Sequence, residues 1–213
     1  MNNFIGIIIS AMYIAFVIVS SKFVNKLGEE ASRKYVHILL SNVWIIYLFF
    51  IDSMWAACVL PIAFVFINLF SYKFKLIKSI EREKNDGLGT VYYAVSMLIA
   101  SIISYGVGCP IVGASGILIM GYGDGLAAIV GKKIKSQKYK IGDTVKSVAG
   151  SLTMFIISLV ISFIVLKIIG IKYLFLDAIC IAVVSTILEA VSIKGLDNIT
   201  VPVIVTILTL LAV

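Results

Sequence analysis

The apolar positions of this chain fall into long stretches that are separated by short polar segments. About 20 apolar residues are needed for a helix to cross the hydrocarbon core of a bilayer. On that measure the pattern predicts eight helices, at roughly 3–22, 35–52, 54–72, 89–107, 110–131, 147–168, 172–192 and 199–213. The last stretch is the shortest, and a helix of its length reaches only about 22 Å against a core about 30 Å thick. We therefore expect seven to eight transmembrane helices.

The composition excludes an ordinary soluble domain. The 213 residues are 61% hydrophobic and 14% charged, and the mean hydropathy is +1.11. Such values are typical of a polytopic integral membrane protein, and the periodicity predicts the all-α class. No linker or low-complexity tract divides the chain, so we expect a single domain over residues 1–213. The first apolar stretch lacks a basic leading segment, so we expect a retained helix there and not a signal peptide.

The distribution of positive charge predicts the topology. All but two of the 18 lysine and arginine residues fall in the first, third, fifth and seventh connections, and the exceptions are Lys167 and Lys172. Positive charge marks the cytoplasmic side of a membrane protein. We therefore expect a multi-pass protein of the cell membrane, with cytosolic basic loops and both termini external. The net charge of +7 is accounted for by this topology, so no nucleic-acid partner is predicted.

A single carboxylate stands in the fifth apolar stretch. Asp124 lies among glycines, next to Gly123, and Gly131 follows two helical turns later on the same face. An acid at membrane depth is costly, and it usually faces a protein interior or a wet cavity. We predict that Asp124 is catalytic and binds a metal ion. The alternative is a stripe of small residues for helix packing, with Asp124 paired to a lysine.

A cationic cluster opens the second helix. His37 lies three residues after Lys34 and four after Arg33, so it shares a helical face with each of the two cations. A guanidinium and an ammonium there could hold phosphate oxygens. His37 is the single histidine of the chain, so we expect it to carry any imidazole proton transfer. The alternative is a positive-inside anchor with a histidine facing a neighbouring helix.

Glycines begin the fourth helix. Gly87, Gly89 and Thr90 stand at its start, and unpaired N–H groups at a helix N-terminus attract anions. The alternative is a turn in which Thr90 caps the helix.

The start of the sixth helix is also suited to phosphate. Lys146 and Ser147 precede Gly150 and Ser151, and Lys132 lies upstream in the same lysine-rich loop. The spacing is not that of a P-loop, and we expect no strand before it. Charge and backbone N–H groups together still favour phosphate. The alternative is a solvated basic loop in which Ser147 caps the helix.

Further acids lie near the C-terminus. Glu189 falls inside the seventh stretch and should have a partner, for which Lys194 and Arg33 are candidates. Asp197 and Asn198 precede the eighth stretch, where either could simply cap the helix. Mg²⁺ is usually held by one or two carboxylates plus substrate phosphates. We therefore expect Mg²⁺ or another divalent cation to use Asp124, Glu189 and Asp197, with Asn198 in the nucleotide site.

These residues together predict a membrane enzyme that acts on a phosphate donor and a lipid, because phosphoryl transfer requires mainly positioning and charge neutralisation. At this point the chain resembles the CTP-dependent lipid kinases, which include dolichol kinase, phytol kinase and the fungal type of diacylglycerol kinase. The likeness rests on motifs in the order Arg33-Lys34-x-x-His37, Gly87-x-Gly89-Thr90-x-Tyr92, Gly123-Asp124-x-x-Ala127 with Gly131, Lys146-Ser147-x-x-Gly150-Ser151, and Asp197-Asn198 with Pro202.

The resemblance implies an all-helical membrane kinase that transfers the γ-phosphoryl group of CTP to the hydroxyl of a polyprenol, phytol or diacylglycerol with a divalent ion. It marks Arg33, Lys34, Asp124 and Gly131 as positions that matter for activity. The family pattern has glutamate where this chain has Ala149, so Glu189 or Asp143 would have to replace it. The alternatives are a CDP-lipid synthase, whose acidic C-terminal signature is not evident, and a transporter, whose internal repeat is absent.

Overall fold

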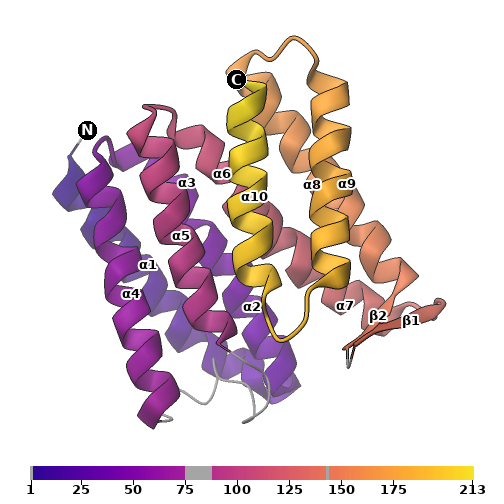
Figure 1. The fold of residues 1–213 in the computed structure, drawn as a ribbon. Coiled ribbons are helices and arrows are strands. Elements are labelled where there is room, and N and C mark those ends of the chain that lie inside the picture. Colours follow the sequence, from indigo (N-terminus) through magenta and orange to yellow (C-terminus); the bar gives the residue numbers. More distant parts are fainter. Residues whose placement is uncertain (1, 75–87, 143) are drawn as a thin grey trace.

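The protein is a bundle of helices with a small hairpin at one end (Figure 1). The computed structural model describes residues 2–74, 88–142 and 144–213. The elements in chain order are α1 (Asn3–Val24), the 3-10 turn η1 (Asn25–Leu27), α2 (Glu29–Ser41), α3 (Val43–Phe50), α4 (Met54–Phe74), α5 (Gly89–Gly106), α6 (Pro110–Leu118), the π-helical turn η2 (Ile119–Asp124), α7 (Gly125–Lys133), β1 (Lys138–Ile141), β2 (Thr144–Ser147), α8 (Val148–Ile169), α9 (Leu174–Val191) and α10 (Asp197–Ala212).

The predicted all-α membrane architecture is confirmed. Within the described residues, six helical segments are long and apolar enough to cross a bilayer: α1, α4, α5, the continuous segment Pro110–Lys133, α8 and α9. The last helix, α10, is apolar but shorter, as expected for the final stretch of the chain.

The predicted second span, 35–52, is wrong in two respects. Its helix begins six residues earlier, at Glu29, and it is divided at Asn42 into α2 and α3. The Asn42 side chain donates to the Tyr13 hydroxyl at 3.3 Å and accepts from the Tyr122 hydroxyl at 2.9 Å. The junction between α2 and α3 is therefore hydrogen-bonded to α1 and to η2.

The fifth span is one continuous helical segment that changes its winding in the middle. Residues Ile119–Asp124 form a π-helical turn, and Asp124 is its last residue. Such turns are rare and occur often at functional sites. A Cβ at Gly121 would lie 2.4 Å from the Ser41 side chain, and one at Gly123 would lie 2.5 Å from the Met154 sulfur. The glycines thus allow α2 and α8 to pack directly on the turn that holds Asp124.

The lysine-rich connection between α7 and α8 contains a hairpin, where no strand was predicted. Strands β1 and β2 are antiparallel, with Lys138 opposite Ser147 and Tyr139 opposite Lys146. Gly142 has a positive φ of 58° in the turn, a backbone conformation that glycine adopts without steric cost. Helix α8 follows β2 without an intervening loop, so the hairpin fixes the residues at the start of that helix.

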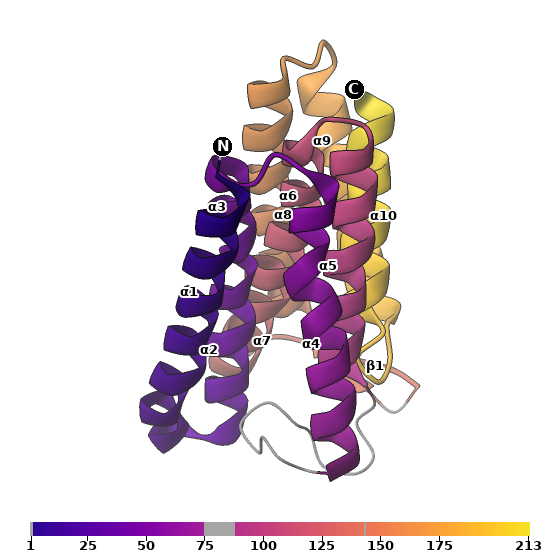
Figure 2. The ribbon, with the colours of Figure 1, turned by 90° about the vertical axis from the view of Figure 1, so that its left-hand side faces the viewer.

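The polar connections gather at one end of the bundle. The α1–α2 connection, the start of α5, the hairpin and the α9–α10 turn lie there, while both termini lie at the opposite end (Figures 1 and 2). This is the arrangement that the predicted topology requires. The assignment of the polar end to the cytosol stays a prediction.

Helix α6 runs through the middle of the bundle and has close backbone contact with α10. A Cβ at Gly116 would lie 2.3 Å from the Pro202 carbonyl oxygen, whereas one at Gly106 would meet only the Met54 sulfur, at 3.9 Å. We expect Gly116→Ala to destabilise the protein by about 1–3 kcal/mol, the usual cost of overpacking, and Gly106→Ala to be tolerated. Thermal unfolding in detergent measures both, and equal midpoints for the two variants would contradict this packing.

Candidate active site

A buried ion pair stands at the centre of the polar end. The Lys34 ammonium, from α2, lies 2.5 Å from Oδ2 of Asp124, the last residue of η2. The two side chains are only 9% and 10% exposed. His37, one helical turn after Lys34, places Nε2 at 3.5 Å from the same oxygen. The predicted shared face of Lys34 and His37 is therefore confirmed, and this face contacts Asp124. The alternative expectation, a lysine partner for Asp124, is also confirmed.

A second buried pair joins the hairpin to the end of α9. Lys146, on β2, donates to the Glu189 backbone carbonyl at 2.7 Å and forms an ion pair with the Glu189 carboxylate. The partners suggested by the sequence, Lys194 and Arg33, are wrong. Lys146 takes that place by reaching Glu189 from β2. Arg33 instead pairs with Glu30 at 2.6 Å, one turn before it on α2.

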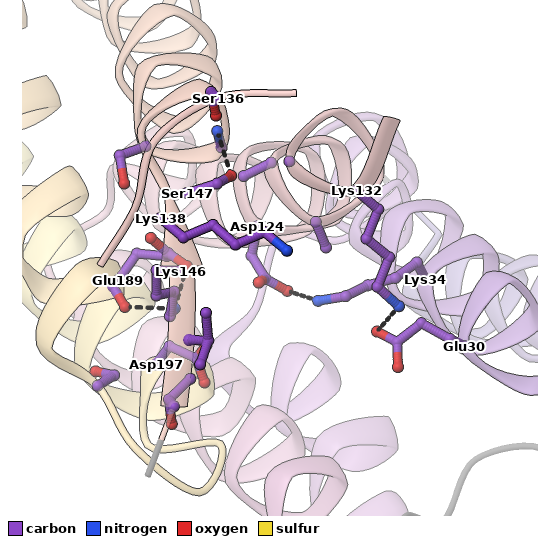
Figure 3. A pocket seen from close by; sticks show the side chains of 18 of the residues that line it. Glu30, Lys34, Asp124, Lys132, Ser136, Lys138, Lys146, Ser147, Glu189 and Asp197 are labelled. Atoms are coloured by element: carbon purple, nitrogen blue, oxygen red, sulfur yellow. Dashed lines mark hydrogen bonds and ion pairs between the residues drawn. The ribbon is translucent and has the colours of Figure 1, made fainter. Parts of the chain in front are cut away.

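Both pairs line one large cavity (Figure 3). Its volume is about 640 Å³, within the range of about 300–1,000 Å³ that is common for ligand pockets. Six lysines and four acids stand in its wall: Lys34, Lys132, Lys135, Lys138, Lys146, Lys194, Glu30, Asp124, Glu189 and Asp197. The excess of ammonium groups favours a polyanionic ligand such as a triphosphate.

The start of α8 forms one side of this cavity. Ser147 caps the helix, because its hydroxyl accepts from the Gly150 N–H at 3.1 Å, and the cap predicted as the alternative is thus confirmed. A Cβ at Gly131 would lie 2.5 Å from this hydroxyl and 3.4 Å from the Gly150 Cα. Gly131 is therefore needed for α7 and α8 to meet. Ser151 also lines the cavity, and its hydroxyl is hydrogen-bonded to that of Tyr139 at 2.5 Å.

The starts of α5 and α10 meet beside a second, smaller cavity of about 100 Å³. Gly89, Thr90 and Asn198 line it, and a Cβ at Gly89 would lie 3.2 Å from the Asn198 amide nitrogen. The predicted caps are wrong: Leu88 and Leu196 occupy the N-cap positions, without side-chain hydrogen bonds. Thr90, Asp197 and Asn198 lie inside the first turns instead. The predicted phosphate contact at Gly87 falls outside the described residues.

The two cavities meet at three charged residues. Lys34, Asp124 and Asp197 line both of them. Arg33 lines the smaller cavity and is not among the residues of the larger one. The Lys34–Asp124 pair therefore lies between the two cavities. We call the larger, lysine-lined cavity the large chamber and the smaller cavity the narrow chamber.

The acids expected to bind a metal all line the large cavity, but they do not form a ready ligand cluster. Among the described residues, no three histidine, cysteine, aspartate or glutamate side chains are grouped closely enough to hold an ion. Asp124 and Glu189 each face a lysine. Mg²⁺ needs only one or two carboxylates when substrate phosphates complete its shell. The residues therefore fit a metal that is bound jointly with a phosphate ligand, and Asp124 is the carboxylate that would hold it.

Sequence reasoning missed Tyr93. Its ring lies beside that of His37, with centroids 4.8 Å apart, and it lines the smaller cavity. The family motif directs attention to Tyr92, which lines none of the described cavities. The one available signal was helical spacing: Tyr93 lies four residues after Gly89, and so on the same face of α5.

Comparison with known proteins supports the resemblance seen in the motifs. No family model matches the chain, and no solved structure matches it. Among curated proteins, the phytol kinase of Synechocystis sp. is 32% identical over 203 residues, which cover 93% of this chain and 87% of the relative. The match thus extends over nearly the whole chain. At that identity and coverage, the chain belongs to the phytol kinase family of membrane lipid kinases.

Proposed function

We propose that the protein is a kinase that transfers the γ-phosphoryl group of a nucleoside triphosphate, CTP in our prediction, to the hydroxyl of an isoprenoid alcohol at the cytosolic face of the membrane. The observation that carries this proposal is the buried Lys34–Asp124 pair, which separates a lysine-lined chamber from a narrow one. A phosphate donor and a lipid acceptor must approach the reacting phosphorus from opposite sides, and the two chambers supply those sides.

The large chamber would hold the triphosphate. Lys132 and Lys138 extend into it from α7 and β1, as Figure 3 shows, and Lys146 stands on the wall formed by β2. Ammonium groups bind phosphate oxygens through charge-assisted hydrogen bonds. Asp124 would hold Mg²⁺ against the donor phosphates, and the ion would neutralise charge on the β- and γ-phosphates.

The narrow chamber would hold the acceptor hydroxyl. His37 Nε2 is buried, and in the described part of the chain it has no hydrogen-bond partner. Neutral imidazole can take the hydroxyl proton as the alcohol oxygen bonds to the γ-phosphorus and the bond to the leaving nucleoside diphosphate breaks. Asp124, 3.5 Å away, would stabilise the imidazolium so formed, and Lys34 would offset charge on the transferred group.

A radiolabel experiment tests this function. Purified protein is incubated in detergent with phytol, geranylgeraniol, a polyprenol or diacylglycerol, and with CTP or ATP labelled at the α or the γ position. We expect γ-label on an isoprenoid alcohol, release of CDP, and a preference for CTP. Transfer of α-label with release of pyrophosphate would instead identify a CDP-lipid synthase. Absence of lipid labelling from every donor would refute the proposal.

A further inference from the structure

The narrow chamber continues into the hydrophobic part of the bundle. A third cavity, of about 50 Å³, shares Leu40, Phe64, Asn68 and Tyr93 with the second one. Its other lining residues are Ile14, Val43, Leu60, Pro61, Ala94 and Met97. We call the second and third cavities together the acceptor groove.

The lining of the acceptor groove changes from charged to apolar along its length. At the site it is bounded by Lys34, Asp124 and Asp197. Beyond Asn68 its wall is almost wholly apolar, and Leu60 and Met97 there belong to the middle turns of α4 and α5. A ligand that fills it must therefore have one polar end at the Lys34–Asp124 pair and an apolar remainder at membrane depth.

Two side chains that line the groove each have a buried polar atom without a hydrogen-bond partner among the residues that the structure describes. His37 Nε2 and the Tyr93 hydroxyl are buried, and neither has a hydrogen-bond partner within the described residues. A buried polar atom without a partner costs free energy that a ligand can recover. An alcohol oxygen can accept from one of these groups while its proton is donated to the other. The pair therefore matches a hydroxyl better than a charged headgroup.

The size of the groove limits the shape of the ligand. The two cavities are much smaller than the approximately 300–1,000 Å³ that encloses a whole small molecule. They can take the first few carbons of one chain, and the rest of that chain would lie in the bilayer. Diacylglycerol has a second acyl chain on the carbon next to its hydroxymethyl group, which requires more width at the level of Phe64 and Asn68.

We infer that the acceptor groove is the lipid-binding site and that it selects a single-chain alcohol, with the hydroxyl on His37 and Tyr93 and the first carbons between Phe64 and Met97. This inference rests on the proposed kinase function for the identity of the ligand. It adds which surface binds the lipid and why one chain is preferred to two.

Two matched pairs of variants test the groove by kinetics. Tyr93→Phe removes one hydroxyl, and we expect the KM for phytol to rise about three- to tenfold, the value of one hydrogen bond, with the KM for the nucleotide unchanged. Phe64→Ala should also raise the KM for phytol. The controls are Tyr72→Phe and Phe66→Ala, because these side chains of α4 are 49% and 62% exposed and line no described cavity. Equal effects in a variant and its control would overturn the inference.

A photoreactive phytol with a diazirine a few carbons from the hydroxyl gives a readout that does not need catalysis. We expect mass spectrometry to find the label on Phe64, Met97 and their neighbours, and excess phytol to compete at least about tenfold better than dioleoylglycerol. Label confined to the outer face of α4, around Phe66 and Phe70, or equal competition by dioleoylglycerol, would overturn the groove. Label in the groove without phosphorylation of any alcohol would refute the kinase function and support the groove.

Discussion

Asp124→Asn is expected to lower the rate of lipid phosphorylation by about a thousandfold, the scale seen when one electrostatic group is removed from a transition state. The substitution keeps the size of the side chain and removes its charge. It takes away the carboxylate that would hold the metal and also the group 3.5 Å from His37. The measurement is the initial rate of γ-phosphoryl transfer to phytol at saturating nucleotide.

The same substitution leaves Lys34 buried without its partner, so loss of the fold must be separated from loss of chemistry. Removing one member of a buried pair costs about 3–5 kcal/mol, whereas replacing both by neutral groups is often close to neutral. We therefore expect a low unfolding midpoint for Asp124→Asn and for Lys34→Met, and recovery of the midpoint in the double variant. Activity should stay low in the double variant. Recovery of both would show that the pair is purely structural.

The sequence was enough to predict a functional setting for Asp124, because a carboxylate at membrane depth has a high free-energy cost. A carboxylate within an apolar stretch needs a cavity or a partner, and the structure supplies both. The lengths of the apolar stretches likewise located most of the spans. Hydropathy did not predict the helix start where a helix extends beyond its apolar part. Helix α2 begins at Glu29 with charged residues. The helical backbone hydrogen bonds continue through these residues, although the apolar pattern does not.

The partner of Glu189 could not be predicted, since it depends on a tertiary feature without a strong local signal. Strands β1 and β2 have four residues each, too short to distinguish from a polar loop by alternation. Their pairing decides that Lys146, and not Lys194, meets Glu189. The narrow chamber could not be predicted for the same reason. Its lining residues come from α1, α2, α4, α5, η2 and α10, which are far apart in the sequence.

Lys146→Met is expected to lower kcat/KM for the nucleotide by about ten- to a hundredfold, since hydrogen bonds to charged groups contribute about 1.5–3 kcal/mol. Lys146 lines the large chamber and reaches it from β2. We expect most of the change in the KM of the nucleotide and little in the KM of phytol, because the acceptor groove does not include this side chain. The control is Lys140→Met, on the neighbouring strand, which is exposed and lines no described cavity.

A second role of Lys146 must be separated from the first, because it also neutralises the buried Glu189 carboxylate. The double variant Lys146→Met/Glu189→Gln removes both charges and should restore the unfolding midpoint, as expected for a buried pair replaced as a unit. If Lys146 binds the donor phosphates, the KM of the nucleotide stays high in this double variant. If its sole role is to hold Glu189 and position α9 against the hairpin, nucleotide binding returns together with stability. The two measurements on one protein therefore distinguish a phosphate ligand from a structural ion pair.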